Sequence, residues 1–177
     1  MSDVNFLKKG SLVSLRLMTE EDFPLIVRWR NDERVRSNFI YRDDFTLEGQ
    51  RSWKETMIDT GKALQFIICE NCRDLRPVGC VYFRDIDKSS AEAEYGIFIG
   101  EEDALGKGYA NESADLATDY ARDEMGLKRL ILRVFADNTS ARRSYEHAGF
   151  TKVKDLPDVE CSDGQKGDMI LMEKFLK

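Results

Sequence analysis

The sequence predicts a mixed α/β domain of the α+β kind, and it predicts a single domain over residues 1–177. Three observations support this prediction. Short apolar runs typical of strands are interspersed with longer runs of helical periodicity. No proline-rich or glycine-rich linker and no internal repeat divides the chain. Residues 91–135 have the order strand, helix, strand, which is the order of a βαβ crossover.

The first elements follow from local signals. A strand is expected at residues 12–17, where Leu and Val recur at every second or third position. Thr19 precedes three acidic residues and Pro24, and this capping residue with an acidic first turn starts a helix that runs to about Asn31. Residues 31–45 are polar with aromatic interruptions and predict a long loop that contains a short helix.

The next segment predicts a helix and three strands. A helical pattern covers residues 46–60. Two β-rich runs, residues 63–70 and 77–85, flank the turn sequence NCRDLR and therefore predict a hairpin. A third run, residues 91–100, predicts a further strand.

The second half of the chain predicts two helices and three strands. Residues 108–124 have alanines at spacings of three and four, and this small-residue stripe lets a helix lie close to a sheet. An apolar strand is expected at residues 129–135 and a helix at residues 138–148. Residues 150–156 and 166–175 predict a final hairpin with the long polar tip PDVECSDGQKG.

Composition and charge exclude several classes of protein. With 42% hydrophobic and 34% charged residues, the chain is expected to be soluble and globular. The net charge is −6 and the basic residues are scattered, which argues against nucleic acid as a partner. No apolar run approaches the roughly 18 residues of a membrane helix, so no membrane partner is expected. The N-terminus lacks the pattern of a signal peptide, so a cytoplasmic location is predicted.

Four cysteines raise the question of metal or redox chemistry. Cys69 and Cys72 have CxxC spacing, but a zinc site needs a second ligand pair and the chain has one histidine, His147. The remaining cysteines, Cys80 and Cys161, form no second CxxC. The sequence therefore predicts free thiols in a reducing compartment and no metal.

Residues 102–113, EDALGKGYANES, link an expected strand to an expected helix. Gly106 and Gly108 let the backbone adopt unusual φ angles and approach an anion closely. The first N–H groups of the following helix are unpaired and lie at its positive end, so a pyrophosphate cradle is physically reasonable. A plain turn is the alternative, since Asn111 occupies the place of the third glycine in GxGxxG and no Walker pattern occurs.

The second half of this unit carries a resemblance to a known family. The stretch GKGYANESADLATDYARDEMGLKRLILRVFADNTSARRSYEHAGF resembles the core of the GNAT superfamily of N-acetyltransferases. Within it, the stretch is most similar to the branch of ribosomal-protein N-terminal, polyamine and aminosugar acetyltransferases. The resemblance covers about residues 92–153 and rests on the glycine loop, the Asn–x₆–Tyr spacing and the terminal GF. It implies a mostly antiparallel sheet of six to seven strands flanked by about four helices.

The resemblance also implies acetyl-CoA as co-substrate, without a metal. In this family the glycine loop binds the coenzyme A pyrophosphate through backbone amides, and the preceding strand pairs with the pantetheine arm. The matching positions are Phe98 and Ile99 in the strand, Leu105, Gly106, Lys107, Gly108, Tyr109 and Ala110 in the loop, and Asn138 and Ala141 in the following helix. Leu105 departs from the usual Arg or Gln. Asn138 also suits a helix N-cap, and both roles can hold at once.

Two residues match the family's catalytic positions. Tyr145 matches the tyrosine that protonates the departing thiolate, and its alternative is a core aromatic. Glu94 occupies a position where the family often has a glutamate, which would free the amine's lone pair as a base. Strand alternation places Glu92 on the same face, so Glu92 is a rival, and both carboxylates could simply lie on a wet face. Cys80 sits in an apolar strand pattern that favours core packing over an acyl-carrier role.

The acceptor side is expected in the first helix and loop, where the family tends to build its substrate pocket. The candidate contacts are Trp29, Asn31, Arg34 and Phe39, and Arg30 and Tyr41 stand beside them. The arginines would suit an anionic group such as a phosphate on the acceptor. The acidic tip, residues 158–163, is a second expected wall.

The resemblance therefore predicts transfer of acetyl from acetyl-CoA to a primary amine by direct attack in a ternary complex. A protein N-terminus, a polyamine and an aminosugar all remain open as acceptors. The competing hypothesis is a non-catalytic acyl-CoA-binding sensor on the same fold, against which Asn138, Tyr145 and Glu94 argue. A homodimer is compatible with the resemblance, and the sequence leaves the number of subunits open.

Overall fold

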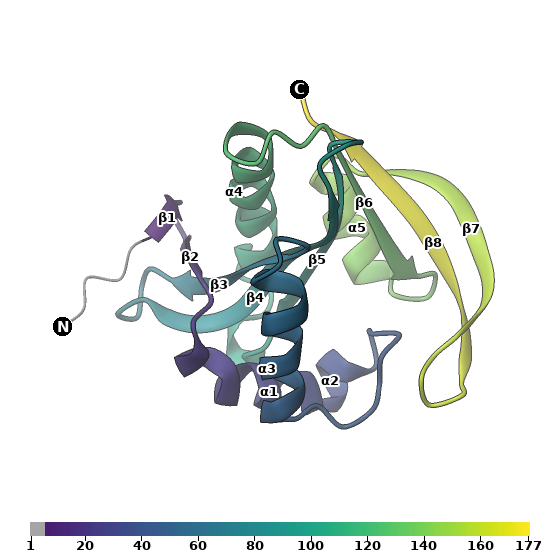
Figure 1. Cartoon of the computed structure of the whole chain (residues 1–177), viewed down its shortest axis with the longest axis horizontal. Coiled ribbons are helices and arrows are strands. Elements are labelled where there is room, and N and C mark those ends of the chain that lie inside the picture. The colour runs from purple at the N-terminus through teal and green to yellow at the C-terminus, as the bar shows by residue number, and fades with distance from the viewer. Residues whose placement is uncertain (1–5) are drawn as a thin grey trace.

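Strand pairing organises the chain around one sheet. The structure is a computed structural model that describes residues 6–177, and within this range the sheet has eight strands in the order β1-β2-β3-β4-β5-β6-β8-β7 (Figure 1). The strands are β1 (Phe6–Lys9), β2 (Val13–Leu17), β3 (Leu64–Glu70), β4 (Arg76–Asp87), β5 (Glu92–Ile99), β6 (Arg129–Phe135), β7 (Thr151–Glu160) and β8 (Lys166–Phe175). All neighbours are antiparallel except β5 and β6.

Helices cover both faces of this sheet. They are α1 (Phe23–Asn31), α2 (Glu33–Arg36), α3 (Leu47–Trp53), α4 (Tyr109–Asp123) and α5 (Thr139–His147). Two short 3₁₀ turns, η1 (Glu20–Asp22) and η3 (Glu102–Ala104), and a π-helical turn, η2 (Lys54–Ile58), complete the described secondary structure. None of the helices in residues 6–177 has both the length and the hydropathy needed to cross a membrane.

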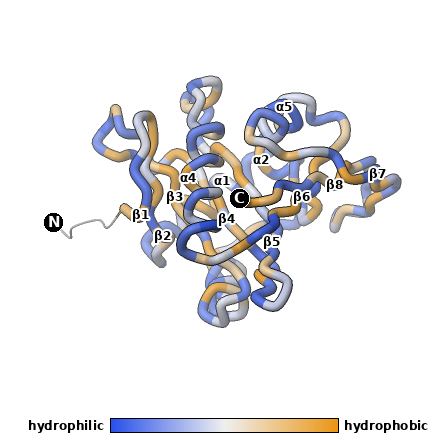
Figure 2. The backbone as a smooth tube through the Cα atoms, turned by 90° about the horizontal axis from the view of Figure 1, so that it is seen from above, coloured by the Kyte–Doolittle hydropathy of each residue, from blue (hydrophilic) through white to orange (hydrophobic). Residues whose placement is uncertain are grey.

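Alternate residues of β4 pack against different helices on the two faces of the sheet. Cys80 packs with Ile26 and Trp29 of α1, whereas Val81 belongs to the cluster that includes the alanine stripe of α4, with Ala117 fully buried. Successive residues of a strand point to opposite faces, so α1 and α4 lie on opposite sides of the sheet. The central strands carry much of the hydrophobic colour in Figure 2, as expected of strands covered on both faces.

The sheet splits between β5 and β6. These strands pair in parallel only from Glu92 opposite Arg129 to Glu94 opposite Ile131. Beyond that point β5 stays with β4, and β6 stays with β8 along its whole length. The second half of β5 and the second half of β6 therefore diverge, and Figure 1 shows β6, β8 and β7 as a separate blade of the sheet.

The structure confirms the mixed α/β class, the hairpin and the βαβ crossover β5–α4–β6. Within residues 6–177 the strands number eight and the α-helices five, more than the six to seven and four expected. The additional strand, β1, is short and has no apolar alternation, and it forms because β2 offers it a free edge. The additional helix, α2, is the short helix expected within residues 31–45.

Two further boundaries differ from expectation. The helix expected over residues 46–60 changes at Lys54 from α3 into the wider turn η2. Strand β7 runs to Glu160, although that segment was expected in the polar tip. Backbone pairing with β8 suffices to extend β7, since ladder hydrogen bonds do not require apolar side chains.

Candidate functional site

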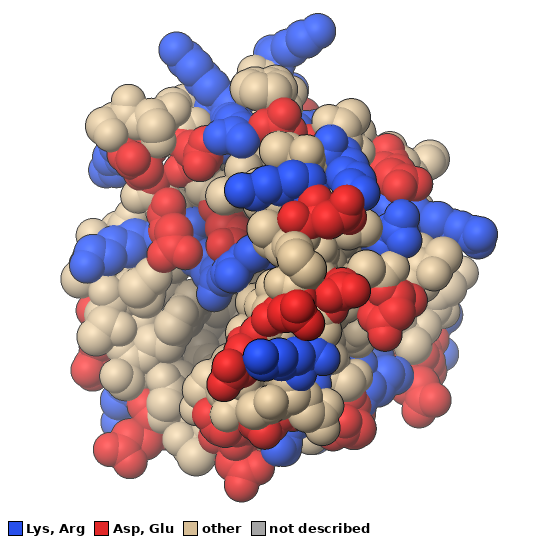
Figure 3. All heavy atoms as spheres, turned by 90° about the vertical axis from the view of Figure 1, so that its right-hand side faces the viewer, with Lys and Arg blue, Asp and Glu red and all other residues tan. Residues whose placement is uncertain are grey.

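A cavity of about 1090 Å³ opens in the split between β5 and β6. One part of its wall comes from the loop before α4 and from α5, and the other part from α1, α2 and the loop that follows. The cavity therefore reaches from one side of the sheet to the other. Acidic and basic side chains are interspersed on the molecular face in Figure 3, in line with the scattered basic residues of the sequence.

The loop before α4 presents backbone N–H groups to this cavity. Gly106 and Gly108 have φ angles of 70° and 79°, in the left-handed region that favours glycine. Hydrogen bonding of the backbone stops at the N–H of Leu105, which donates to Glu102, and resumes at Glu112, which donates to Gly108. Among the described residues, the N–H groups of residues 106–111 have no acceptor, so this helix start can bind an anion.

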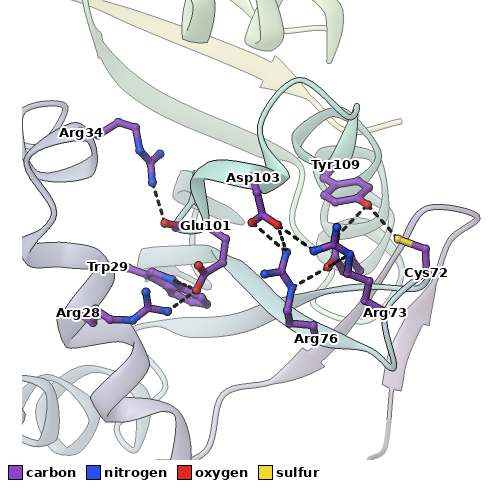
Figure 4. A network of polar contacts seen from close by, with 11 residues as sticks. Arg28, Trp29, Arg34, Cys72, Arg73, Arg76, Glu101, Asp103 and Tyr109 are labelled. Atoms are coloured by element: carbon purple, nitrogen blue, oxygen red, sulfur yellow. Dashed lines mark hydrogen bonds and ion pairs between the residues drawn. The ribbon is translucent and has the colours of Figure 1, made fainter.

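Side chains from the β3–β4 hairpin hold this loop in place (Figure 4). Asp103 accepts hydrogen bonds from Arg73 at 2.9 Å and from Arg76 at 3.0 Å. Arg76 also donates to Glu70 at 2.7 Å, and the Tyr109 hydroxyl donates to the other oxygen of Glu70 at 3.1 Å. Both ends of the glycine loop are thus tied to one buried carboxylate.

The ionisation of Glu70 is fixed by this network. Glu70 is fully buried, and burial alone would raise its pKa. The hydrogen bonds from Arg76 and Tyr109 outweigh that effect and lower the pKa of Glu70 below its ordinary value. The loop is therefore tethered by a carboxylate that stays charged at neutral pH.

The residues that precede the glycine loop are fixed by α1 and α2 (Figure 4). Arg34 donates to the carbonyl oxygens of Ile99 at 3.1 Å and Gly100 at 2.7 Å. Glu101 accepts a hydrogen bond from the Trp29 indole at 2.8 Å and also pairs with Arg28. These contacts set where β5 ends and where the loop begins.

The free edge of β5 faces the split. Gly100 donates to Val78 on β4, and backbone direction alternates along an antiparallel ladder. The backbone groups of Phe98 therefore turn to β4, whereas those of Ile97 and Ile99 turn to the split. The backbone of Ile99, whose carbonyl oxygen also accepts from Arg34, and that of Ile97, which was not among the predicted cofactor residues, turn to the split, whereas the backbone of Phe98 is used by β4. Counting alternate residues along the expected strand would have shown that the backbone of Ile97 turns the same way as that of Ile99. Pairing with a pantetheine arm stays a prediction.

Asn138 caps α5. Its side-chain oxygen accepts from the N–H of Ala141 at 3.1 Å, and its amide donates to Asn38 at 2.9 Å. The N-cap alternative is thus confirmed, and the cofactor contact stays a prediction. Ala141 lines the cavity one turn later, and Ser144 of α5 donates to Asn111 of α4 at 2.8 Å. The bond from Asn138 to Asn38 connects α5 to the loop after α2, and the bond from Ser144 to Asn111 connects it to α4, so α5 is held to both walls of the cavity.

Tyr145 lies between the aromatic core and the cavity. Its ring packs edge-on against Tyr95 at 6.3 Å and Phe150 at 6.0 Å, and it also lines the cavity. Among the described residues no partner accepts or donates a hydrogen bond at its hydroxyl. Burial raises the pKa of Tyr145 above its ordinary value, so the phenol remains a proton donor at neutral and mildly alkaline pH.

The structure distinguishes Glu94 from Glu92, the alternative candidate for the base. Glu94 lines the cavity and accepts hydrogen bonds from Arg84 at 2.9 Å and from Arg133 at 3.1 Å. Glu92 does not line the cavity, and it pairs with Arg129 at the closed end of the split. Arg84 was not anticipated, although its cross-strand position opposite Glu94 could have been found by pairing the expected strands.

The other predicted cofactor residues divide by position. The cavity is lined by Leu105, which is 46% exposed, and by Gly106, Gly108, Tyr109 and Ala110. Lys107 does not line it and lies over the ring of Tyr109, with 5.8 Å from its amine to the ring centroid. The loop backbone, rather than the lysine, is thus turned towards the cavity.

Only two of the four predicted acceptor contacts reach the cavity. Arg34 and Phe39 line it, whereas Trp29 is 1% exposed in the core beneath β4 and β5. Asn31 makes two hydrogen bonds to the backbone of Phe45, both of 2.8 Å, and so clips residues 31–45 to α1. Trp29 packs in the core and Asn31 fixes the following loop to α1, so both support the pocket without lining it.

The acidic tip of the last hairpin supports the pocket without lining it. Within residues 158–163, Ser162 donates its N–H to Ile40 and accepts from the Arg42 N–H, while Asp163 pairs with Arg42 at 3.5 Å. The tip therefore positions the loop that carries Phe39.

The cysteines are free thiols, and three of the four are buried. Cys80 is fully buried against α1, and burial raises its pKa to about 12, which confirms core packing. Across residues 6–177, no group of three or more His, Cys, Asp or Glu side chains could hold a metal ion.

Comparisons with known proteins agree with this geometry. A model of the acetyltransferase (GNAT) domain matches residues 13–151. An N-acetyltransferase of Bacillus licheniformis, p20, whose role is uncharacterized, is 27% identical over 163 residues, 90% of each chain. The spermidine N(1)-acetyltransferase of Vibrio cholerae is 24% identical over 171 residues, 94% of this chain and 97% of that one.

A solved structure shows the same fold. The spermidine N-acetyltransferase of Vibrio cholerae in complex with CoA and spermine superposes with a TM-score of 0.86 at 22% sequence identity. The match covers 94% of this chain and 97% of that chain.

Proposed function

The chain belongs to the GNAT family of acetyl-CoA-dependent N-acetyltransferases, and on that premise we propose that it acetylates the primary amine of a small-molecule acceptor. The amine attacks directly in a ternary complex, within a single acetyltransferase domain. One observation carries this proposal: the glycine loop, the free edge of β5, Glu94 and Tyr145 all border the same cavity.

The residues present fit coenzyme A. The N–H groups of residues 106–111 suit the pyrophosphate, and the backbone of Ile97 and Ile99 suits the amide-bearing pantetheine arm. Acetyl-CoA supplies an activated acetyl thioester when it is bound. The protein contributes orientation, because the loop and strand that would hold the cofactor are fixed by the Glu70 and Arg34 contacts.

Glu94 and Tyr145 are assigned complementary proton transfers. Glu94, held by Arg84 and Arg133, accepts the proton of the acceptor ammonium directly or through water. Tyr145, which burial keeps protonated, donates its proton where the thiolate departs. No protein nucleophile takes part, and the buried Cys80 thiol plays no role.

The experiment is thiol release from acetyl-CoA measured across a panel of primary amines, with calorimetric binding of CoA as a parallel measurement. Acetylation of at least one amine is expected, with initial-rate kinetics of a ternary complex. Tight CoA binding without turnover of any amine would favour the acyl-CoA sensor instead. A cytoplasmic location and a homodimer stay predictions, which fractionation and sedimentation equilibrium test.

A further inference from the structure

Arg30 is an unusual cation in the cavity wall. It projects from α1, and its guanidinium carbon lies 3.4 Å from the ring centroid of Phe39 and 5.1 Å from that of Phe45. The Nη1 atom of Arg30 is buried and has no hydrogen-bond partner among the described residues. Two aromatic faces thus hold a guanidinium whose donor groups make no hydrogen bond within residues 6–177.

No carboxylate neutralises Arg30 within residues 6–177. Burial lowers its pKa, and the nearby Arg84 acts in the same direction. Removing a charge from water without an opposite charge is costly, and the two aromatic rings offset only part of that cost, so an anionic ligand would stabilise Arg30.

The rest of the pocket has the same sign. Among the described residues, two carboxylates line the cavity, Asp44 and Glu94, against five arginines, Arg30, Arg34, Arg84, Arg133 and Arg143. Glu94 is shared by two of these arginines, and Asp44 pairs with Arg36 at 3.2 Å. Part of this excess suits the anionic cofactor, and the part on the acceptor side, Arg30 and Arg84, disfavours a polycationic acceptor.

Arg30 lies on the acceptor side of the cavity, away from the pyrophosphate loop. Helix α1, which carries Arg30, packs on the face of β4 that bears Cys80. By strand alternation, Arg84 and its partner Glu94 on β5 lie on the same face. The glycine loop instead follows the opposite end of β5, after Ile99. Gly96 leaves room for Tyr82 to cross β5, since a Cβ there would lie 2.2 Å from the Tyr82 ring. An anion on Arg30 would therefore lie in the same cavity and on the same face of the sheet as the candidate base, Glu94.

We infer that the acceptor is an amine that also carries an anionic group, a carboxylate or a phosphate, and that Arg30 binds this group. The inference deepens the proposed function and rests on it. Arg30 and Arg84 both line the cavity, and a guanidinium is the side-chain group best suited to carboxylate and phosphate oxygens. Polyamines, the acceptors of the similar Vibrio cholerae enzyme, lack this group.

The test compares amines that differ only in the anion. D-Glucosamine 6-phosphate is paired with D-glucosamine, 5-aminopentanoate with pentylamine, and spermidine is the cationic reference. At least one amine that carries the anion should exceed its anion-free partner by roughly 10- to 100-fold in kcat/KM, the range for a hydrogen bond to a charged group. The pair with the larger ratio shows whether the acceptor's anionic group is a phosphate or a carboxylate.

Variants of Arg30 link the preference to this residue. Arg30→Gln should remove most of the preference by raising the acceptor KM, Arg30→Lys should keep part of it, and the KM for acetyl-CoA should not change. Arg122→Gln, at a surface arginine paired with Asp119 and Asp123, is the control. Calorimetric binding of each amine to the CoA-loaded protein gives a readout independent of turnover.

Distinct results overturn the inference and the proposed function. The inference alone is overturned if spermidine or the anion-free amines are acetylated faster than the amines that carry an anion. It is also overturned if a folded Arg30→Gln protein keeps an unchanged preference for the anionic amines. CoA binding without acetylation of any amine overturns the proposed function.

Discussion

The two walls of the cavity differ in how they recognise a ligand. The cofactor wall offers backbone N–H groups of residues 106–111 and the free edge of β5, whereas the acceptor wall offers side chains such as Arg30 and Phe39. Backbone recognition depends on local conformation, which a short motif encodes through glycines at positive φ. Side-chain recognition depends on which distant segments meet, so sequence patterns describe it poorly. Four substitutions, each with a matched control, test this contrast.

The largest expected effect is on proton donation. Tyr145→Phe should lower kcat about 10²- to 10⁴-fold and leave the KM for acetyl-CoA nearly unchanged, because only the acid is removed. Steady-state kinetics measure this, with Tyr120→Phe as the control, a tyrosine that packs on Phe66. In the wild type, kcat should not fall as the pH rises to about 10, since the raised pKa keeps the phenol protonated. A Tyr145→Phe variant with full kcat removes this residue from the acid role.

The second comparison separates two strand glutamates. Glu94→Gln should reduce kcat/KM about 10²-fold, because an amide cannot accept the ammonium proton. Glu92→Gln, which also loses an arginine partner, should retain near wild-type activity since it lies outside the cavity. Kinetics of both variants with the same amine decide the matter. Equal losses would show that ion pairing across the sheet, rather than base catalysis, explains the effect.

The third comparison uses two glycines with matched backbones. Gly106 and Gly164 have φ angles of 70° and 81°, and an added Cβ meets nothing within 4 Å at either. Alanine at each should cost about 1–2 kcal/mol of folding free energy. Only Gly106→Ala should raise the KM for acetyl-CoA, by roughly tenfold, while the acceptor KM stays the same. A similar rise in Gly164→Ala would mean that the loop backbone has no special role.

The smallest expected effect is on acid stability. A lowered pKa at Glu70 gives stability that is present above its ordinary value of 4.5 and is lost as the pH falls through the folded value. Tm should therefore fall as the pH drops below about 4.5. Glu70→Gln should weaken this dependence and lower Tm at pH 7 by about 2–4 °C, the shift for 1 kcal/mol in a domain of this size. Scanning calorimetry measures both, with the exposed Glu55→Gln as control. An unaltered pH dependence in Glu70→Gln would assign the acid sensitivity to other carboxylates.

The sequence described the cofactor wall better than the acceptor wall, for physical reasons. Strand β6 has the bounds that its apolar run predicts, residues 129–135, because its alternate residues Leu130, Leu132 and Val134 are buried in the core. The N-cap at Asn138 is equally local. In contrast, β1 depends on the edge of β2, and Trp29 is a core residue because β4 and β5 happen to pack on it. The sequence placed Arg30 beside the expected acceptor contacts, but its position between the rings of Phe39 and Phe45 and its lack of a partner among the described residues depend on the folded chain.

Hydrogen–deuterium exchange with and without CoA is the most direct test of the proposed binding mode, in which CoA binds in the β5–β6 split through the amides of residues 106–111 and the free edge of β5. CoA should slow exchange at residues 106–111 and at Ile97 and Ile99, while the hairpin turn at residues 162–165 should not change. Unchanged exchange at residues 106–111 under saturating CoA, or protection confined to another part of the protein, would contradict the account.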